Sequence, residues 1–342
     1  MSLPRVSVII TVYNRERFIA DAVQSILDQT YRNFELIIVD DGSTDRTVER
    51  ITSFPDRRVR LVRHQRNLGI PFARNTGLDE AAGTFIAWLD SDDIARRHRL
   101  ENQIRFLDSN PSVAMVGSCA GKIDGGGARK SGVRVPPLTY DDIKCWLLFR
   151  SAFQQSSIIG RAEILKQYRY RAEFPVCEDV DMFVRLTRRH QVRNLPEVLI
   201  DRRLHQGQII RNQRDAILRA QTKISMRLLD DLGVAYNSDD ARKHVMLGGS
   251  FEYRPDLEYL RWAEDWLVRL LDANFVSKTL SPAALQLCAS FLWIRACSRS
   301  VKVPGRSRYP RRMLASPLTR GIVSKQAGAW LGNALPLMAG IL

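Results

Sequence analysis

The sequence predicts an α/β fold, with a mostly parallel sheet that has helices on both faces, followed by a helical C-terminal region. Between residues 6 and 90, apolar β-branched runs alternate with segments whose apolar residues recur at helical spacing. Such alternation is typical of right-handed strand–helix–strand crossovers. From about residue 211 an arginine-rich helical pattern replaces it. The 342 residues suit about two domains, which we expect at 1–210 and 211–342.

Four strands and three helices are expected in the first ninety residues. The strands are VSVIITVY (6–13), FELIIVD (34–40), RVRLVRH (58–64) and TFIAWLD (84–90). The helices are 17–31, 47–54 and 70–83. Phe18, Ala22 and Ile26 fall at helical spacing in the first helix, Gly42 makes the turn before the second, and Gly83 stops the third.

Fewer elements can be assigned beyond residue 110. We expect a strand at 113–123, a glycine-rich turn at 125–132 (GGGARKSG), and a helix near 141–149 within a mixed stretch. The segment 174–190 has an acidic start and a basic end, which suits the dipole of a helix. A last strand is expected at 192–205, ending at His205.

Three of the expected strands end in polar residues. These ends are Tyr13-Asn14, Asp40-Asp41-Gly42-Ser43 and Asp90-Ser91-Asp92-Asp93. In a parallel sheet the carboxyl ends share one edge, where ligands bind. Three carboxylates within four residues repel one another, and hard divalent cations such as Mg²⁺ or Mn²⁺ take such oxygen ligands together with substrate phosphates. The alternative is an Asp-rich helix cap on the surface.

Three further groups are candidates for the same edge. Arg74 meets a phosphate, or else forms a structural ion pair with an aspartate cluster. Glu178 and Asp179 lie at a helix N-terminus, where the anion is stabilised and a proton acceptor fits; the alternative is plain capping. His205 completes a metal or diphosphate shell, or is an ordinary surface histidine.

The motifs occur in the order of a known family. VSVIITVYN, VDDGSTD, NLGIPFARNTG, FIAWLDSDD and CEDVDMFVRL together resemble the family 2 glycosyltransferases of the GT-A fold, which is Rossmann-like. The resemblance covers about residues 5–205. It implies transfer of a sugar, usually from a UDP-linked donor, to an acceptor hydroxyl with inversion at the anomeric carbon. A divalent metal, Mn²⁺ or Mg²⁺, is the implied cofactor.

The resemblance also implies roles for individual residues. Asp179 matches the catalytic base, with Glu178 beside it. A metal is expected at Asp90, Asp92, Asp93 and His205. The donor is expected at Thr11, Tyr13, Asn14, Asp41, Asn67, Arg74, Asp90 and Ser91. Two positions depart from the family pattern: Thr11 stands where many members have proline, and Val180 stands where an aromatic residue is common.

Composition points to a reducing compartment and an anionic partner. The five cysteines form no CxxC pair, which argues against a disulfide framework or a zinc site. The N-terminus lacks a cleavage-site pattern, so we expect no signal peptide and a cytoplasmic protein. The net charge is +15, and from Phe275 onward there are ten Lys or Arg but no acid. Such a field favours an anionic membrane surface or nucleic acid.

Two apolar stretches in this region, 281–294 and 326–342, are shorter than the roughly 20 residues of a membrane span. Together with the basic segment between them, they suit peripheral binding to the inner face of the plasma membrane, where a glycan or lipid-linked acceptor would be met. The alternative is a small helical domain with an apolar core.

Three other functions fit the sequence less well. A sugar-nucleotide pyrophosphorylase would carry a glycine-rich, arginine-containing loop after its first strand, where this chain has TVYNRERF. A nucleic-acid binder would fit the high pI, but no binding motif is present and no nucleic acid is expected as a partner. An inactive relative conflicts with the intact DSDD and ED motifs. The sequence therefore favours a hexosyltransferase in polysaccharide or glycolipid synthesis.

Overall fold

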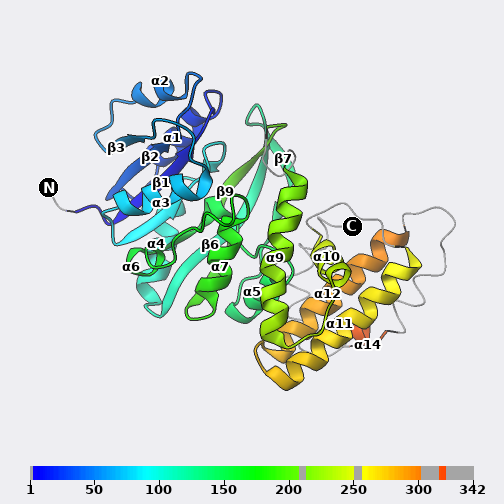
Figure 1. Ribbon diagram of the computed structural model, residues 1–342. Coiled ribbons are helices and arrows are strands. Elements are labelled where there is room, and N and C mark those ends of the chain that lie inside the picture. Colours follow the sequence, from blue (N-terminus) through cyan, green and yellow to red (C-terminus); the bar gives the residue numbers. More distant parts are fainter. Residues whose placement is uncertain (1–2, 208–212, 250–255, 302–315, 321–342) are drawn as a thin grey trace. The chain divides into compact units, whose positions relative to one another are not determined.

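The computed structural model describes residues 3–207, 213–249, 256–301 and 316–320, and it forms two compact units (Figure 1). The first unit comprises Met1–Tyr140 and Phe153–Arg214, and the second comprises Asp141–Ala152 and Asp215–Leu342. The chain thus leaves the first unit for a short excursion before it finally enters the second. No shift in composition marks that excursion, which is why sequence patterns suggest a single boundary near 210.

A nine-stranded sheet forms the first unit, in the order β3-β2-β1-β4-β8-β6-β9-β5, with β7 paired to β6. β1 to β4 run parallel to one another, as do β6 and β9, whereas β5, β7 and β8 are antiparallel to their partners. The strands are β1 (Val6–Val12), β2 (Phe34–Asp40), β3 (Val59–Arg63), β4 (Phe85–Trp88), β5 (Ile94–Ala95), β6 (Val113–Asp124), β7 (Arg129–Arg134), β8 (Ile159–Arg161) and β9 (Gln191–Leu204).

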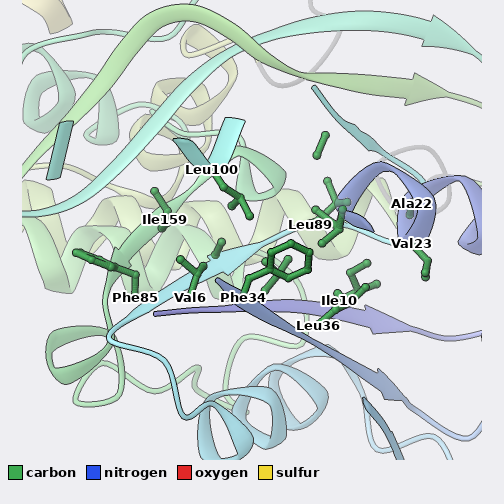
Figure 2. Close-up of a cluster of buried hydrophobic side chains, with 14 of the residues drawn as sticks. Val6, Ile10, Ala22, Val23, Phe34, Leu36, Phe85, Leu89, Leu100 and Ile159 are labelled. Atoms are coloured by element: carbon green, nitrogen blue, oxygen red, sulfur yellow. The ribbon is translucent and has the colours of Figure 1, made fainter. Parts of the chain in front are cut away.

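Helices cover both faces of this sheet, as predicted. They are α1 (Ile19–Leu27), α2 (Thr47–Thr52), α3 (Ile70–Glu80), α4 (Arg99–Ser109), the 3-10 helix η1 (Gln155–Ser157), α6 (Ala162–Leu165) and α7 (Glu178–Thr187). Figure 2 shows the core on one face, where Val6 and Ile10 of β1 lie in one cluster with Ala22 of α1 and Leu100 of α4.

α3 packs against the opposite face. Side chains alternate along a strand, so Ile9 of β1 faces away from the α1 side. A β-carbon at Gly77 of α3 would lie 2.4 Å from Ile9 Cγ2. The glycine therefore allows α3 to approach the sheet closely, and this approach places Arg74 of the same helix beneath the carboxyl ends of the strands.

One expectation for the first unit is wrong. The segment 125–132 is not a turn throughout, because β7 begins at Arg129 and pairs with β6. Three consecutive glycines indicated a turn, but the turn closes after Gly127, where φ is 89°. The exposed residues that follow are held by cross-strand hydrogen bonds, which polarity alone does not reveal.

The second unit is helical. It contains α5 (Tyr140–Leu147) from Asp141 on, α9 (Arg214–Leu232) from Asp215 on, α10 (Ser238–Leu247), α11 (Leu257–Ser277), α12 (Pro282–Val301) and α14 (Pro317–Arg320). The apolar residues of 281–294, read above as a candidate membrane segment, lie in α12, where Leu285, Leu292 and Trp293 are buried in the core of this unit. The helical-core alternative therefore describes that stretch.

Two further points concern membrane contact. The second apolar stretch, 326–342, lies outside the described residues. No helix in the described part of the chain is both long enough and apolar enough to cross a bilayer.

A fully buried histidine lies in the core of the second unit. His244 Nε2 donates to Leu148 O (2.7 Å), and its Nδ1 accepts from Trp266 Nε1 (3.0 Å). The ring stacks on Phe149 with centroids 4.5 Å apart. Because Nδ1 accepts a hydrogen bond, the imidazole is neutral. Burial lowers the pKa of His244 from 6.5 to about 4, and the bond to Leu148 O opposes that shift.

His244 predicts that the protein loses stability in mild acid. A folded-state pKa below the unfolded value means full stability above pH 6.5, with about 3 kcal/mol lost as the pH falls from 6.5 to about 4. Denaturant unfolding at several pH values should show a steeper acid loss for the wild type than for His244→Gln, which keeps a donor and an acceptor but does not titrate. Parallel curves for the two proteins would contradict this assignment.

Candidate active site

The loops that follow β1 and β2 are tied together at the carboxyl edge of the sheet. Asn14 N donates to Ser43 Oγ (2.9 Å), and Asn14 Oδ1 accepts from Thr44 N (2.8 Å). Asn14 has a φ of 51°, a left-handed conformation in which asparagine is enriched. Beside it, Tyr13 is 41% exposed and Thr11 is half-buried at the end of β1. These three residues thus line the rim of the edge.

Asp41 holds the next loop in place. Its Oδ1 accepts from Leu68 N and its Oδ2 from Gly69 N, each over 2.9 Å. His64 Nδ1 lies 2.7 Å from Asp41 Oδ1. The carboxylate is nearly buried, so these partners offset its desolvation. The predicted donor residue is therefore also the anchor of the loop before α3.

Gly42 lets that loop approach β2. Its φ is 77°, and a β-carbon there would lie 2.5 Å from Arg66 C. Any other residue would be both strained and in collision with the loop backbone. The close approach leaves Asn67 exposed at the same rim as Tyr13.

Ser156 lies between two carboxylates of the DSDD segment. Asp90 is half-exposed and Asp93 is buried. Ser156 Oγ lies 2.9 Å from Asp90 Oδ2 and forms a shorter hydrogen bond with Asp93 Oδ2. A hydroxyl has one hydrogen to donate, so one of these bonds needs a carboxyl proton. Burial raises the pKa of Asp93 well above its ordinary value, and Asp92 and Asp90 add to the shift. Burial therefore favours the protonated form of Asp93, and Ser156 links this carboxyl group to that of Asp90.

Asp93 is only 3% exposed, and its Oδ1 accepts from Arg203 N of β9 (2.9 Å). These contacts give it a structural role that joins the DSDD segment to β9. Asp90, by contrast, has a side chain that is 35% exposed. Burial also raises the pKa of Asp90, with Arg74 opposing the shift and Asp92 adding to it. Ser91, between the two, is buried.

Asp92 pairs with His205, which follows the end of β9. His205 Nε2 lies 2.8 Å from Asp92 Oδ2, and His205 Nδ1 accepts from Gly207 N (3.1 Å). Because Nδ1 accepts, the proton of a neutral ring is on Nε2 and points at Asp92. The ring also packs on Phe18, with centroids 4.6 Å apart. The structure thus places His205 beside the DSDD segment.

Arg74 joins two of the predicted motifs. Its Nη2 lies 3.6 Å from Asp90 Oδ1 and 3.2 Å from Glu178 Oε1. The guanidinium carbon lies 5.8 Å from the ring centroid of Trp88 and 5.3 Å from that of Tyr170. Arg74 is 7% exposed, and burial would lower its pKa, but Glu178 foremost raises it above the ordinary value. A buried cation is thus held between the DSDD segment and α7.

Within the described part of the chain, Arg74 Nε and Nη1 have no hydrogen-bond partner. A guanidinium has five N–H groups, so Arg74 keeps donors for a ligand besides those that face the carboxylates.

The N-terminus of α7 presents Glu178 and Asp179, the two residues predicted to be catalytic. Cys177 precedes it with a φ of 62°, which turns the chain sharply into the helix. Glu178 is 4% exposed, and burial raises its pKa to about 7, with Arg74 opposing the shift and Asp179 adding to it. Asp179 is half-buried, and its Oδ1 accepts from Val180 N (2.8 Å). Of the two carboxylates, Asp179 is the more exposed.

The structure also reveals site residues that the sequence patterns missed. Ser156 links two carboxylates, Tyr170 and Trp88 flank Arg74, and Arg203 Nε donates to Asp92 O (2.9 Å). Ser156 and Tyr170 come from the mixed stretch 140–170, where no periodicity is recognisable. Only Trp88, within the FIAWLD strand, carried a sequence signal, because it lies two residues before Asp90.

The residues present fit a divalent metal only with help from a ligand. Among the described residues, no three His, Cys, Asp or Glu are grouped so that they could hold a metal ion. Asp90 and Asp92 nevertheless repel each other, since Asp92 raises the pKa of Asp90. Mg²⁺-type ions are usually held by one or two carboxylates plus substrate phosphates and water. Two neighbouring carboxylates match that donor set.

A pocket of about 520 Å³ opens beside His205. It is lined by residues that follow β1 and by residues around the end of β9. The lining comprises Asn14, Arg15, Glu16, Arg17, Phe18, Asp45, Gly125, Leu204, His205, Gln206 and Gly207. A small-molecule site of this volume is ordinary, and this pocket adjoins the Asp92–His205 pair.

Comparison with known proteins identifies the family. The Glycosyl transferase family 2 model matches residues 7–169. An uncharacterized glycosyltransferase of Haemophilus influenzae is 31% identical over 218 residues, which are 60% of this chain and 67% of that protein. The chain belongs to glycosyl transferase family 2. This membership confirms the resemblance read from the motifs and favours a transferase over a pyrophosphorylase.

One further relative and one solved structure are also similar to this chain. An Escherichia coli protein named UDP-Glc:alpha-D-GlcNAc-diphosphoundecaprenol beta-1,3-glucosyltransferase WfgD is 42% identical over 113 residues, which are 33% of this chain and 45% of WfgD. The mannosyltransferase PcManGT of Pyrobaculum calidifontis, solved with GDP-Man and Mn²⁺, has a TM-score of 0.55 at 16% identity and covers 94% of this chain and 86% of its own. The latter similarity confirms the GT-A-like fold.

The buried ion pair predicts strong coupling between Arg74 and Glu178. Arg74→Met leaves Glu178 without its cation and should cost about 3–5 kcal/mol of unfolding free energy. Glu178→Gln in that background should cost much less than it does alone, so the double-mutant cycle should be non-additive by more than about 1 kcal/mol. Chemical denaturation without metal measures all four proteins.

The exposed pair Arg169–Asp79, at 50% and 56% exposure, is the matched control. Arg169→Met should change the free energy of unfolding by less than about 1 kcal/mol. Additive effects at Arg74 and Glu178 would show that the two side chains do not share one electrostatic network.

Proposed function

We propose that this glycosyltransferase moves a hexose from a nucleoside diphosphate sugar, with UDP favoured, to an acceptor hydroxyl with inversion at the anomeric carbon. The observation that carries the proposal is the position of Arg74, which contacts both Asp90 and Glu178. A donor bound at Asp90 and an acceptor hydroxyl beside Asp179 would then lie on either side of one cation. In-line transfer requires such a close arrangement.

The donor would bind at the rim formed by the loops after β1, β2 and β4. Thr11, Tyr13 and Asn14 would line the nucleotide pocket. Asp41 would face the nucleobase of the donor and would also anchor the loop before α3. The remaining donor contacts would come from Asn67, Ser91 and the unpartnered donors of Arg74. The UDP-Glc in the name of WfgD supports a UDP-linked donor.

Asp179 would act as the general base. Its carboxylate is half-exposed at the N-terminus of α7, where the helix dipole stabilises the anion. It would accept the proton of the acceptor hydroxyl while that oxygen bonds to the anomeric carbon and the nucleoside diphosphate leaves. Glu178 would keep Arg74 in place and would not touch the acceptor, because it is buried against the guanidinium.

Asp90 and Asp92, with His205 beside them, would hold a divalent metal. A bound Mn²⁺ or Mg²⁺ would supply positive charge for the leaving diphosphate. The Mn²⁺ in the PcManGT structure supports metal use in this fold. For His205 to become a ligand, the proton of its neutral ring would have to move from Nε2 to Nδ1, and the hydrogen bond from Gly207 N to Nδ1 would be lost. Asp93 is left out of the metal set because its oxygens are engaged by Ser156 and Arg203.

The acceptor belongs, in this proposal, to cell-surface polysaccharide or glycolipid synthesis on the cytoplasmic side of the plasma membrane. The lipid diphosphate acceptor in the name of WfgD supports this setting. The apolar residues of 281–294 lie in the core of the second unit and do not support membrane contact. The proposed location at the membrane therefore depends on the nature of the acceptor.

The donor proposal predicts metal-dependent nucleotide binding. Calorimetry with UDP, GDP and dTDP, each with Mn²⁺ and with EDTA, should show tight binding of one nucleotide only when Mn²⁺ is present. Asp92→Ala should weaken that binding by about tenfold or more, because it removes a charged ligand. If none of the three nucleotides binds under either condition, the donor assignment is wrong.

The base assignment predicts a loss of rate without a loss of donor binding. Asp179→Asn should lower kcat by about 10²–10⁴-fold and leave the affinity for nucleotide and Mn²⁺ unchanged. Asp181→Asn on the same helix is the control, since Asp181 is paired with Arg185 (2.8 Å) and is buried away from substrate. It should lower stability and keep the pH dependence of kcat. Full activity in Asp179→Asn would exclude this residue as the base.

A further inference from the structure

A row of cations crosses three strands of the first unit. Lys122 of β6 is the register partner of Lys130 on β7 and of Arg202 on β9. Arg134 lies further along β7, where it pairs with Ala120 beyond an irregularity in the register between Ala120 and Lys122. Figure 1 shows these three strands side by side. We call Lys122, Lys130, Arg134 and Arg202 the cationic row.

The cationic row is electrostatically unfavourable by itself. Like charges directly opposite each other on neighbouring strands destabilise a sheet. Lys130 is compensated, because its Nζ lies 3.1 Å from Asp124 Oδ2. Lys122 and Arg202 face each other without an ion pair to any carboxylate in the described ranges. A β-carbon at Gly132 would lie 3.2 Å from Lys122 Nζ, so this ammonium lies over the backbone of β7.

The cationic row is close to the proposed catalytic base. Burial, helped by the charge of Arg202, lowers the pKa of Arg134 to about 10, and the carboxylate of Asp179 opposes that shift. Arg134 Nη1 also donates to Gln154 Oε1 (2.7 Å), which fixes the guanidinium between β7 and the segment before η1. The next residue, Gln155, donates to the Tyr170 hydroxyl (3.1 Å), and Tyr170 flanks Arg74, which contacts Glu178 beside Asp179. A chain of contacts therefore connects Arg134 with the N-terminus of α7.

The donor carboxylates contact the other face of β9. Successive side chains on a strand point to opposite faces, so Arg203 lies opposite Arg202. Arg203 donates from Nε to Asp92 O (2.9 Å) and from Nη2 to Asp21 Oδ2 (2.8 Å). The face that carries Lys122 and Arg202 is thus distinct from the face that contacts the DSDD segment. An anion bound by the cationic row is accordingly better assigned to the acceptor than to the donor.

We propose that Lys122, Arg134 and Arg202 bind a phosphate or diphosphate group on the acceptor and so direct its free hydroxyl to Asp179. This inference depends on the proposed function, because it takes Asp179 as the base. The acceptor is then a phosphorylated glycan or a sugar on a diphosphate, and not a neutral sugar. The anion supplies the negative charge that Lys122 and Arg202 lack among the described residues.

The test separates the acceptor anion from the donor diphosphate. The full-length protein is first saturated with UDP and Mn²⁺, and farnesyl diphosphate is then titrated by calorimetry below its micelle concentration. Farnesol, which has the same chain without charge, is titrated in parallel. Wild type should bind farnesyl diphosphate and not farnesol. Lys122→Ser and Arg202→Ser should each weaken that binding by about tenfold or more and leave UDP binding unchanged.

Arg129→Ser is the matched control. Arg129 is exposed on β7 and pairs with Ile123, next to the Lys122–Lys130 pair. The substitution therefore removes one positive charge from the same hairpin but from its opposite face. It should keep the affinity for farnesyl diphosphate. Loss of binding in all three variants would reduce the effect to net charge and overturn the proposal.

The remaining outcomes also decide the question. Unchanged affinity in Lys122→Ser and Arg202→Ser would overturn the proposal, as would a parallel loss of UDP binding, which would assign these cations to the donor. If UDP fails to bind the wild type, the choice of UDP as the donor nucleotide is wrong, and titration of farnesyl diphosphate alone still tests the anion site. Because the variants relieve repulsion, their melting temperatures should equal or exceed that of the wild type, which excludes misfolding as the cause.

Discussion

The site depends on one buried cation. Arg74 is held by two aromatic rings and two carboxylates, and it is the group through which the DSDD segment and the N-terminus of α7 contact each other. Without it, Asp90 and Glu178 would be uncompensated charges in a low-dielectric environment. The close packing of Gly77 on Ile9 places the guanidinium there. A contact in the core of the sheet thus sets the electrostatics of the edge.

The carboxylates of the site fall into two physical classes. Asp41 and Asp93 are nearly buried, and backbone N–H groups donate to them, so they hold loops and strands in position. Asp90 and Asp179 are half-exposed and keep oxygen atoms accessible to a ligand. Both classes look alike in a sequence, because DSDD and VDDG do not record which oxygen atoms are already satisfied. Burial and hydrogen bonding separate structural aspartates from reactive ones.

The structure explains the apolar stretch in the second unit and the cluster of positive charge in the first. In the second unit, the apolar stretch of α12 packs among other helices around His244 and Trp266. A segment whose sequence resembles a membrane-binding helix is therefore part of the hydrophobic core. In the first unit, cations gather on one face of β6, β7 and β9 because strand register aligns Lys122 with Arg202. Net charge alone indicates an anionic partner; the register indicates where that partner would be met.

The sequence by itself determined the strands from β1 to β4, the helices between them and the motifs at the strand ends, because these depend on periodicity and on neighbouring residues. It also indicated the family, since each of the five motifs can be recognised from neighbouring residues and their order follows the family's. Only the tertiary structure decided that Ser156 and Tyr170 join the site, that residues 129–134 form a strand, and that Arg74 faces Asp90 and Glu178. The contacts of Ser156, Tyr170 and Arg74 join residues far apart in the chain, and such contacts leave no periodic signal. The strand at 129–134 pairs with the strand just before it, but its residues are polar and mostly exposed, so no alternating apolar pattern marks it.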